Sequence, residues 1–334
     1  MDKYILDISR LEVGDIILTA QDGLISKAVR FVTKSDYSHA MLYVGDCSVI
    51  HSDGNGVHSK NPQRMLFDEP TYAEVLRLAV KPDLSAIQRA CSFARSQIGR
   101  EYSVPDAIMA KTRPVSARES NRQFCSRLVA QAFDYAGVKL VGDPDYCTPQ
   151  EIFESTLLMA VEGCIRVAAA QELAIAKSEG QLGRQDEATN SFLSMARGAS
   201  GDDLQDFGQV TQFLMKNPRF DRDFSAALRR SGYLDLWKMD LVANPWRYDR
   251  DYFSLLPISK LQLAELAEAE LKMAENQLRQ REIELGKHEA IYQMAPLEYF
   301  GLKVELYETL VKTCNRRISA AGAVLAIRQE EKGG

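Results

Sequence analysis

The sequence predicts an α+β domain followed by an all-α domain. Short runs rich in β-branched and aromatic residues, bounded by Gly and Asp, fill the first half of the 334-residue chain. After about residue 165 these runs fade, and apolar residues recur at helical spacing instead. A chain of this length is sufficient for two domains. We therefore place the domains at residues 1–165 and 166–334.

The strands predicted in the first domain form an antiparallel sheet. Residues 16–19 follow a turn at Gly14-Asp15, and residues 73–80 form a later strand. Between them, residues 39–44 and 48–51 are predicted to form a hairpin with the loop Gly45-Asp46-Cys47, and a short strand follows Asn55-Gly56. Tight turns join antiparallel neighbours, because parallel strands need longer connections.

Helices are also expected in the first half of the chain. Residues 25–32, 83–98 and 125–135 carry apolar residues at helical spacing, and a further helix begins near Gln150. Gly99 and Gly137 follow two of these segments, at positions where glycine commonly ends a helix.

The second domain is predicted to be helical throughout. Residues 165–235 divide into several helices at turns over 178–180 and 198–201. Residues 258–330 then form a coiled-coil-like hairpin that reverses near Pro296. One stripe of each helix is apolar, so each needs a partner, and the hairpin is a candidate for self-association or for docking another protein. The stripes comprise Ala264, Ala267, Leu271, Ala274, Leu278 and Leu285, with Arg281 as a charged member, and Phe300, Val304, Tyr307, Val311, Cys314, Ile318, Ala321 and Leu325.

The composition argues against several classes of protein. A net charge of −5 is the wrong sign for a chain-wide nucleic-acid interface. The six cysteines include no CxxC pair, which predicts reduced thiols. No run approaches roughly 18 uninterrupted apolar residues, and the first residues lack an apolar signal region. We therefore expect no transmembrane segment and synthesis in the cytoplasm, and action outside the cell would need a leaderless secretion route.

Three of the four histidines cluster in the predicted hairpin region: His39, His51 and His58. With a three-residue loop, Met41 lies opposite His51, and His39 and His51 project from one face roughly 7–8 Å apart at the backbone. Two imidazoles at this separation can serve one site. A two-residue loop would place them on opposite faces, so the inference depends on the loop length.

Cys125 begins an amphipathic helix, which favours a nucleophilic role. Free backbone N–H groups and the positive end of the helix dipole are expected to lower the pKa of its thiol and to hold an oxyanion. The preceding loop carries basic residues that would favour the thiolate further if they approach it: Lys111, Arg113, Arg118 and Arg122.

Structural interpretations of the same residues remain open. A cysteine on a helix is more often a small core residue, and a histidine in a strand is more often a hydrogen-bonded structural residue. A His, His, Cys set also suits zinc, but no ligand-pair spacing supports it, so we predict neither a metal nor another cofactor.

The order and context of these residues resemble a known family. The segments concerned are Gly14-Asp15-Ile16-Ile17-Leu18, residues 35–46 around His39, Val49-Ile50-His51-Ser52, Gly56-Val57, Ile98-Gly99-Arg100-Glu101-Tyr102, Phe124-Cys125-Ser126-Arg127-Leu128-Val129 and Thr148-Pro149-Gln150-Glu151-Ile152. Together, over residues 12–160, they resemble the circularly permuted NlpC/P60 (papain-like) family. This family includes the YaeF/YiiX-like proteins and the lecithin:retinol acyltransferase-like enzymes. The resemblance implies a circularly permuted papain-like domain with an antiparallel sheet.

The resemblance implies a role for each candidate residue. The family's nucleophile corresponds to Cys125, its base to His39 and its third polar residue to His51. Three further residues in the matching segments are candidates for contacts with substrate or oxyanion: Tyr37, Tyr102 and Arg127.

The implied activity is a cysteine hydrolase that forms a thioester acyl-enzyme. Its expected substrate is a lipid acyl ester, as for a phospholipase, or a peptide or peptidoglycan amide. Histidine at the third position is shared with the lipid-acyltransferase branch, which favours acyl esters. The alternatives are an acyltransferase that uses the same three residues and an inactive binding module. A bacterial toxin or effector role rests on analogy alone, because such enzymes carry catalytic domains beside unrelated helical regions.

Overall fold

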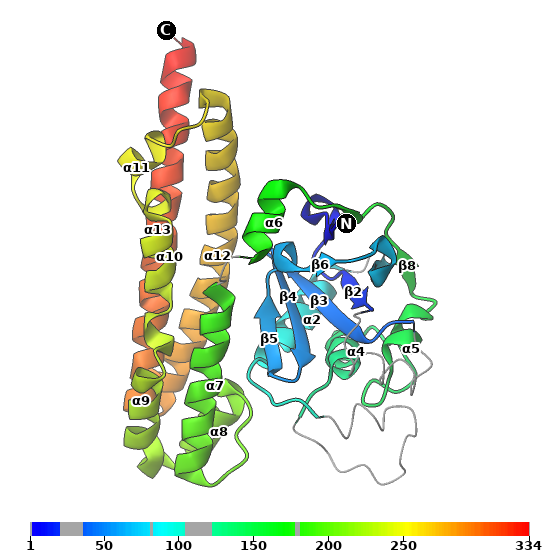
Figure 1. Ribbon diagram of the computed structural model, residues 1–334. Helices are drawn as coiled ribbons and strands as arrows, with labels where there is room; N and C mark the ends of the chain where they lie inside the picture. Colours follow the sequence, from blue (N-terminus) through cyan, green and yellow to red (C-terminus); the bar gives the residue numbers. More distant parts are fainter. Residues whose placement is uncertain (1, 21–35, 81–82, 104–121, 178–180, 334) are drawn as a thin grey trace. The chain divides into compact units, whose positions relative to one another are not determined.

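The computed structural model describes residues 2–20, 36–80, 83–103, 122–177 and 181–333. The chain forms two compact units, Met1–Asp186 with Leu204–Val210, and Glu187–Asp203 with Thr211–Gly334 (Figure 1). The first unit contains helices and antiparallel sheets and the second contains helices, so the predicted α+β class is confirmed. The helix expected at 25–32 and the basic residues Lys111, Arg113 and Arg118 lie outside the described residues.

A six-stranded antiparallel sheet is the centre of the first unit. Its strand order is β5-β4-β3-β2-β7-β8. The strands are β2 (Ile16–Thr19), β3 (His39–Gly45), β4 (Ser48–Asp53), β5 (Gly56–Lys60), β7 (Ala73–Leu78) and β8 (Leu158–Ala160). All but β8 correspond to predicted strands.

A smaller sheet has the order β6-β1-β9 and was not predicted. Its strands are β1 (Tyr4–Leu6), β6 (Leu66–Phe67) and β9 (Ile165–Val167). Strands of two or three residues are too short to show an alternating pattern, which explains why the sequence does not reveal them.

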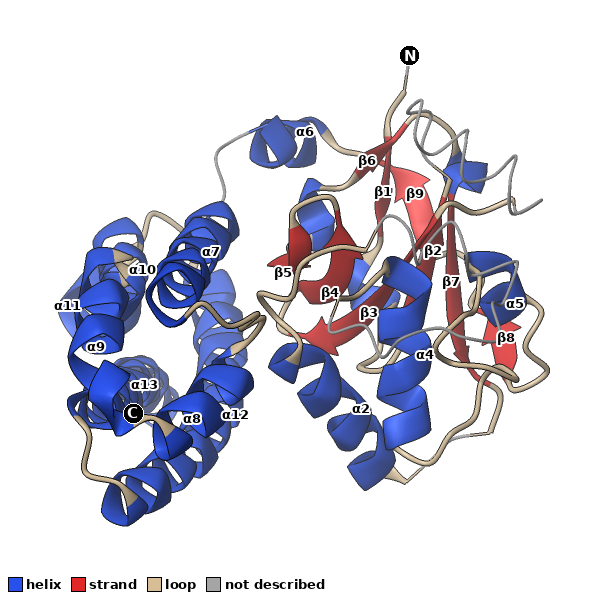
Figure 2. Ribbon diagram, turned by 90° about the horizontal axis from the view of Figure 1, so that it is seen from below, coloured by secondary structure: helices blue, strands red, loops and turns tan. Residues whose placement is uncertain are grey.

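Helices α2 (Leu84–Ser96) and α4 (Cys125–Tyr135) pack against one another and against the large sheet (Figure 2). Alternate residues of the strands supply the core beneath them, including Leu18, Ala40 and Leu42. The opposite face of the same strands carries Ile17, Met41 and Tyr43 in a second core.

The predicted helix ends in this unit are confirmed. Gly137 has φ +86° directly after α4. Helix α5 (Pro149–Phe153) begins with a capping box between Thr148 and Glu151. A short helix, α6 (Ala170–Lys177), follows β9.

The β3–β4 hairpin has the predicted register, but its turn differs from the one predicted. Its turn is two residues, Asp46 and Cys47, both with positive φ, rather than the expected three-residue loop. A β-bulge between Tyr43 and Gly45 shifts the pairing by one residue. The bulge restores the pair Met41–His51, so His39 and His51 share a face although the turn is short.

Gly56 fixes the start of β5 next to the segment that follows α2. It has φ +93°, and a Cβ atom there would lie 2.5 Å from the Arg100 carbonyl oxygen. The Val57 N–H donates to the same oxygen at 2.8 Å, and the Gly99 N–H donates to the Val57 carbonyl at 2.9 Å. These contacts hold residues 99–102 beside the end of the hairpin.

The second unit is helical, as predicted. Its helices are α7 (Gln181–Ser200), α8 (Phe207–Lys216), α9 (Asp221–Arg230), α10 (Trp237–Ala243), α11 (Arg250–Ser254), α12 (Lys260–Met294) and α13 (Glu298–Gly333); the first residues of α7 and α8 belong to the first unit. The turn expected at 198–201 is shorter than predicted, because α7 continues to Ser200 and only Gly201 has positive φ. None of the described helices is long and apolar enough to span a membrane.

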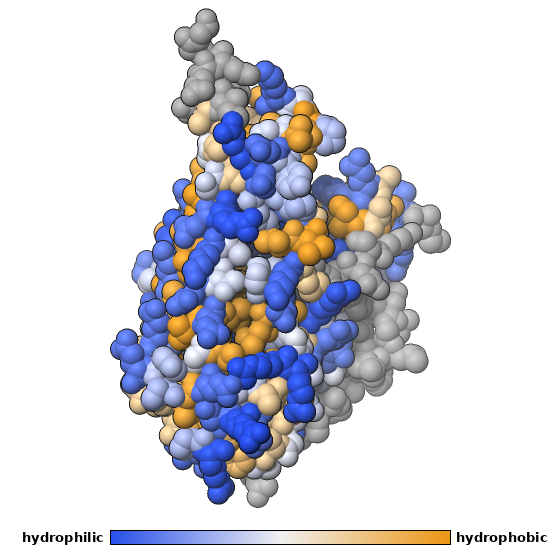
Figure 3. All heavy atoms as spheres, turned by 90° about the vertical axis from the view of Figure 1, so that its left-hand side faces the viewer, coloured by the Kyte–Doolittle hydropathy of each residue, from blue (hydrophilic) through white to orange (hydrophobic). Residues whose placement is uncertain are grey.

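The long hairpin is confirmed, since α12 and α13 pack along each other on either side of Pro296. Ala264, Ala267 and Ala274 are buried as the stripe predicts. Glu270 is also buried, which the stripe does not predict. The face drawn in Figure 3 mixes hydrophilic and hydrophobic side chains and shows no single continuous apolar surface.

Candidate active site

Three neighbouring strands bring the three clustered histidines together. In the sheet, His51 of β4 lies directly opposite His58 of β5, and His39 begins β3. The Nε2 atom of His39 lies 2.9 Å from Nδ1 of His51, and the two rings meet edge to face with centroids 5.0 Å apart. The rings of His51 and His58 are closer still, with centroids 4.2 Å apart.

Both imidazoles of the hydrogen-bonded pair are neutral near pH 7. Burial lowers the pKa of His39 to about 4. Burial also lowers the pKa of His51 well below its usual value, and the neighbouring His39 and His58 lower it further. A single proton therefore lies between Nε2 of His39 and Nδ1 of His51.

The position of that proton decides which nitrogen of His39 acts as a base. When Nε2 of His39 donates to Nδ1 of His51, Nδ1 of His39 keeps its lone pair, and no described residue hydrogen-bonds to it. His51 must then carry its own proton on Nε2. That atom is buried and has no partner among the residues that the structure describes.

Cys125 lies at the first position of α4, as predicted. Its cap residue, Phe124, contributes no side-chain hydrogen bond, so the first N–H groups of the helix are not occupied by a capping side chain. Cys125 is only 6% exposed, and the backbone N–H groups of Ala40 and Ser126 lie near enough to act on its thiol.

The helix start lowers the pKa of the Cys125 thiol as expected, but the net shift is upward. Burial raises the pKa of Cys125, and the nearby N–H groups of Ala40 and Ser126 offset only part of that effect. The resting thiol of Cys125 and the imidazoles of His39 and His51 are therefore all neutral near pH 7.

The pairing of β3 with β4 ends before the pairing of β3 with β2. Strand β2 pairs with β3 as far as His39, whereas β4 pairs with β3 only from Met41 onward. The Ala40 N–H that acts on the Cys125 thiol belongs to the peptide that follows His39, where the β3–β4 ladder ends.

Tyr102 is near both Cys125 and Asp53. It forms a parallel bridge with Gln123, two residues before Cys125. Burial raises the pKa of Tyr102, and the nearby Cys125 and Asp53 raise it further. Its hydroxyl is therefore protonated near pH 7 and lies within electrostatic range of both side chains.

The other two candidate residues have different surroundings. Tyr37 packs on Phe153 with ring centroids 5.2 Å apart, and burial together with Glu74 and Asp36 raises its pKa to about 12. None of these contacts involves the histidines or Cys125.

Arg127 is buried, and its guanidinium donates to the carbonyl oxygens of Asp145 and Arg122 at 2.8 and 3.1 Å. It also stacks near the rings of Phe124 and Tyr146. Through these contacts Arg127 connects the segments on either side of α4 and stabilises the fold there.

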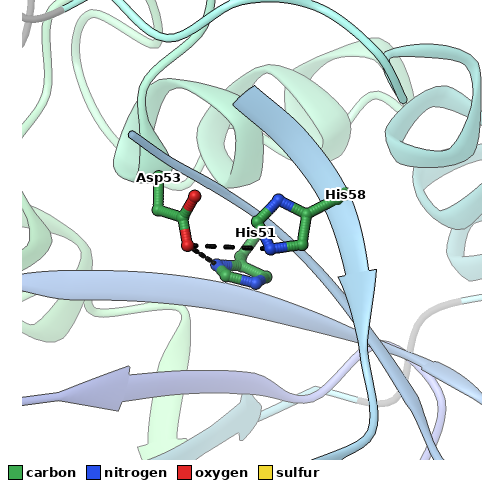
Figure 4. A group of neighbouring side chains, drawn as sticks. All are labelled: His51, Asp53 and His58. Carbon is green, nitrogen blue, oxygen red and sulfur yellow. Dashed lines mark ion pairs between the residues drawn. The ribbon is translucent and has the colours of Figure 1, made fainter. Parts of the chain in front are cut away.

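The sequence motifs indicate no role for Asp53 and none for His58 beyond its place near two other histidines. Figure 4 shows the Asp53 carboxylate facing the rings of His51 and His58. Its Oδ2 lies 3.9 Å from His51 Nδ1 and 3.6 Å from His58 Nε2. The signal available in the sequence was the Asp-Gly-Asn-Gly turn at residues 53–56, which pairs His51 with His58.

The raised thiol pKa predicts how Cys125 responds to pH. Because a raised pKa leaves little thiolate at neutral pH, the rate of alkylation of Cys125 by iodoacetamide is expected to keep rising from about pH 7 to beyond about pH 9. Peptide mass spectrometry at each pH measures this rate for Cys125 separately from the other thiols. A rate that is already constant at neutral pH would instead indicate a preformed thiolate.

Comparison with known proteins bears on the first unit. Residues 10–151 match a family model described as permuted papain-like amidase enzyme, YaeF/YiiX, C92 family. The chain is also similar to a crystal structure described as the metalloprotein yiiX from Escherichia coli O157:H7, with 18% identity over 46% of this chain and 97% of that chain and a TM-score of 0.31. No curated protein matches the chain.

The family match agrees with the resemblance seen in the sequence and supports hydrolase chemistry of the amidase type at the level of the family. Residues 10–151 of this chain thus match the permuted papain-like amidase family of the YaeF/YiiX type, and the recognition made from the sequence motifs is confirmed.

Proposed function

We propose that the first unit is a thiol amidase in which Cys125 is the nucleophile, His39 the general base and His51 the positioning residue for His39. The observation that carries this proposal is the 2.9 Å contact between His39 Nε2 and His51 Nδ1, and it is supported by the action of the Ala40 N–H, next to His39 in the chain, on the Cys125 thiol. A base held by a second polar group beside a thiol is the arrangement that nucleophilic acyl transfer needs.

The first half-reaction forms the acyl-enzyme. Nδ1 of His39 takes the thiol proton as Sγ of Cys125 attacks the carbonyl carbon of the amide. His39 is then an imidazolium, and its Nε2–H donates to Nδ1 of His51 as a charge-assisted hydrogen bond. Because both groups start neutral, this charge develops only during the reaction, where the His51 contact stabilises it most.

The uncapped start of α4 suits the oxyanion. Its N–H groups can donate to the negatively charged oxygen of the tetrahedral intermediate. The protonated hydroxyl of Tyr102, which is in electrostatic range of Cys125, is a second candidate donor. Collapse of the intermediate breaks the C–N bond, and the His39 imidazolium gives its proton to the leaving amine.

The second half-reaction releases the acid. Nδ1 of His39 takes a proton from water, the resulting nucleophile attacks the thioester carbon, and the thiol of Cys125 is regenerated with that proton. An amide substrate is favoured over a lipid ester because the family model is described as amidase. An acyltransferase would differ only in the acceptor that replaces water.

Trapping the acyl-enzyme tests this proposal directly. Purified full-length protein is incubated separately with a peptidoglycan digest, with N-acylated peptides and with phospholipid vesicles, then quenched in acid and analysed by intact-protein mass spectrometry. The expected result is a mass increase equal to the acyl part of an amide substrate, located on Cys125 and removed by hydroxylamine.

Each other result has a distinct meaning. An adduct that forms only with vesicles would identify a lipid deacylase, and transfer of the acyl group to an added amine or alcohol would identify an acyltransferase. If folded protein forms no adduct on Cys125 with any of the three, while a thiol-directed acyl electrophile also fails to label it, the domain is an inactive binding module.

A further inference from the structure

The end of the β4–β5 hairpin carries a cluster that the proposed mechanism does not use in full. One ligand atom from each of His51, Asp53 and His58 lies within 4.8 Å of the other two. The two oxygens of the Asp53 carboxylate have different contacts. Oδ1 accepts from the Asn55 N–H at 2.9 Å and stabilises the turn, whereas Oδ2 faces the two imidazoles (Figure 4).

The hydrogen bonding of His58 fixes which of its nitrogens faces Asp53. Nδ1 of His58 donates to the carbonyl oxygen of Gly56 at 3.1 Å, so Nε2 carries a lone pair. That lone pair points toward Oδ2 of Asp53, 3.6 Å away, which is itself an acceptor. A histidine that donates its other N–H to a backbone carbonyl is the usual arrangement for a metal ligand.

The third atom of the cluster is Nδ1 of His51, which is an acceptor when His39 donates to it. It lies 3.9 Å from Oδ2 of Asp53. Two imidazole nitrogens and one carboxylate oxygen thus converge, with no described hydrogen bond among the three. Such a set of acceptors is complementary to a cation once His51 Nδ1 is released from His39.

We propose that Nδ1 of His51, Oδ2 of Asp53 and Nε2 of His58 form a site for a divalent transition-metal ion of the zinc class. Ligand bonds of about 2.0–2.1 Å in a tetrahedral arrangement place neighbouring ligand atoms about 3.4 Å apart. The observed separations of 3.6 and 3.9 Å, and the third, which is at most 4.8 Å, shorten to this value when the side chains close on the ion and His51 exchanges His39 for it. Three protein ligands leave the fourth position for water.

The surroundings indicate a reversible site. The Asp53 side chain is 39% exposed, whereas those of His51 and His58 are 4% and 12% exposed, so an ion enters from the Asp53 side. Lys60 lies near enough to act electrostatically on both His39 and His51. Its positive charge disfavours a cation, so we expect binding that a chelator readily reverses.

Metal binding and the hydrogen bond from His39 require the same atom of His51. Nδ1 of His51 has a single lone pair, which either accepts the proton of His39 Nε2 or binds the metal. An ion in the site therefore releases His39 from His51 and switches off the base. This inhibitory role rests on the proposed function, whereas the site itself does not.

Zinc binding is tested first in a protein in which the Cys125 thiol is replaced. Zinc chloride is titrated into full-length Cys125→Ser protein by calorimetry, and cobalt(II) is added for absorption spectroscopy. We expect one ion per chain and a cobalt spectrum without a thiolate-to-metal band. Asp53→Asn and His58→Gln, each added to Cys125→Ser, should weaken binding by at least about tenfold, and His288→Gln, which changes a histidine of the second unit, should not.

The ligand set is also tested without further substitution, in case those variants fold poorly. X-ray absorption of the zinc-loaded Cys125→Ser protein should show nitrogen and oxygen neighbours in tetrahedral number. Binding that Asp53→Asn and His58→Gln leave unchanged, or that depends on Cys125, would overturn the proposal. The absence of zinc binding to the folded protein would do the same.

Inhibition is measured separately on the wild-type protein with whichever substrate forms the acyl-enzyme. Zinc should reduce turnover and a chelator should restore it, and His58→Gln should require at least about tenfold more zinc for the same reduction. Zinc that binds without inhibiting contradicts the competition for Nδ1 and leaves the site intact. Absence of turnover contradicts the proposed function. The proposed zinc site is then still tested by the calorimetric titration.

Discussion

Cys125→Ala is expected to lower hydrolysis by about four to six orders of magnitude, to the background of the assay. Without Sγ there is no thioester, and the remaining N–H groups of α4 can only stabilise a reaction with water. Alanine leaves a small apolar side chain at the start of the helix, so folding should be preserved. Release of amine from the substrate that forms the acyl-enzyme is the measurement.

Cys91→Ala is the matched control. Cys91 is also a buried thiol on a helix of the same core, and burial raises its pKa as it does for Cys125. It has no place in the proposed mechanism, so its loss should leave turnover within about twofold, since it costs only a packing contact. Equal losses in both variants would indicate damage to the core, and full activity in Cys125→Ala would refute the assigned nucleophile.

Glu270→Ala is expected to lower the free energy of unfolding of the second unit by about 3–5 kcal/mol. The Glu270 carboxylate is 3% exposed and accepts from Arg317 Nε at 2.6 Å, and it also lies 3.5 Å from Arg247 Nε. Arg317 is itself 5% exposed. Removal of the carboxylate leaves a buried guanidinium without its counter-charge, which costs more than the pair contributes when intact.

Urea unfolding followed by circular dichroism measures this effect, with Glu268→Ala as the control. Glu268 lies two residues earlier on the same helix and is exposed, so its replacement should change the unfolding free energy by no more than about 0.5 kcal/mol. A similar small change for Glu270→Ala would show that Arg317 finds other partners. Two remaining partners are Gln277, which accepts from Arg317 Nη1 at 2.6 Å, and Asp240, whose charge also acts on Arg317.

Strong local patterns explain the parts of the fold that could be predicted. The apolar spacing of residues 125–135 and the glycine at 137 determine the extent of α4. The stripes on either side of Pro296 determine the α12–α13 hairpin. In contrast, the register of β3 and β4 depends on a bulge at Tyr43–Gly45, and a bulge leaves no alternation signal in a seven-residue strand.

In the candidate site too, sequence motifs indicate some residues and only the tertiary structure reveals others. The sequence motifs pointed to Cys125, His39 and His51, but Asp53 and the role of His58 became visible only when β5 paired with β4. The sign of the pKa shift at Cys125 was also beyond the sequence. Helix position and burial act in opposite directions on a thiol, and only the packing shows that burial is the larger effect.

By itself, the sequence determined the α+β class, the long helical hairpin and the family resemblance over the first half of the chain. Each of these depends on the local spacing of apolar residues or on short motifs. The tertiary structure alone decided which charged groups face one another. It placed Glu270 against Arg317 and one carboxylate between two imidazoles. Such contacts join residues from different strands or helices, and their energies depend on burial, which no local pattern records.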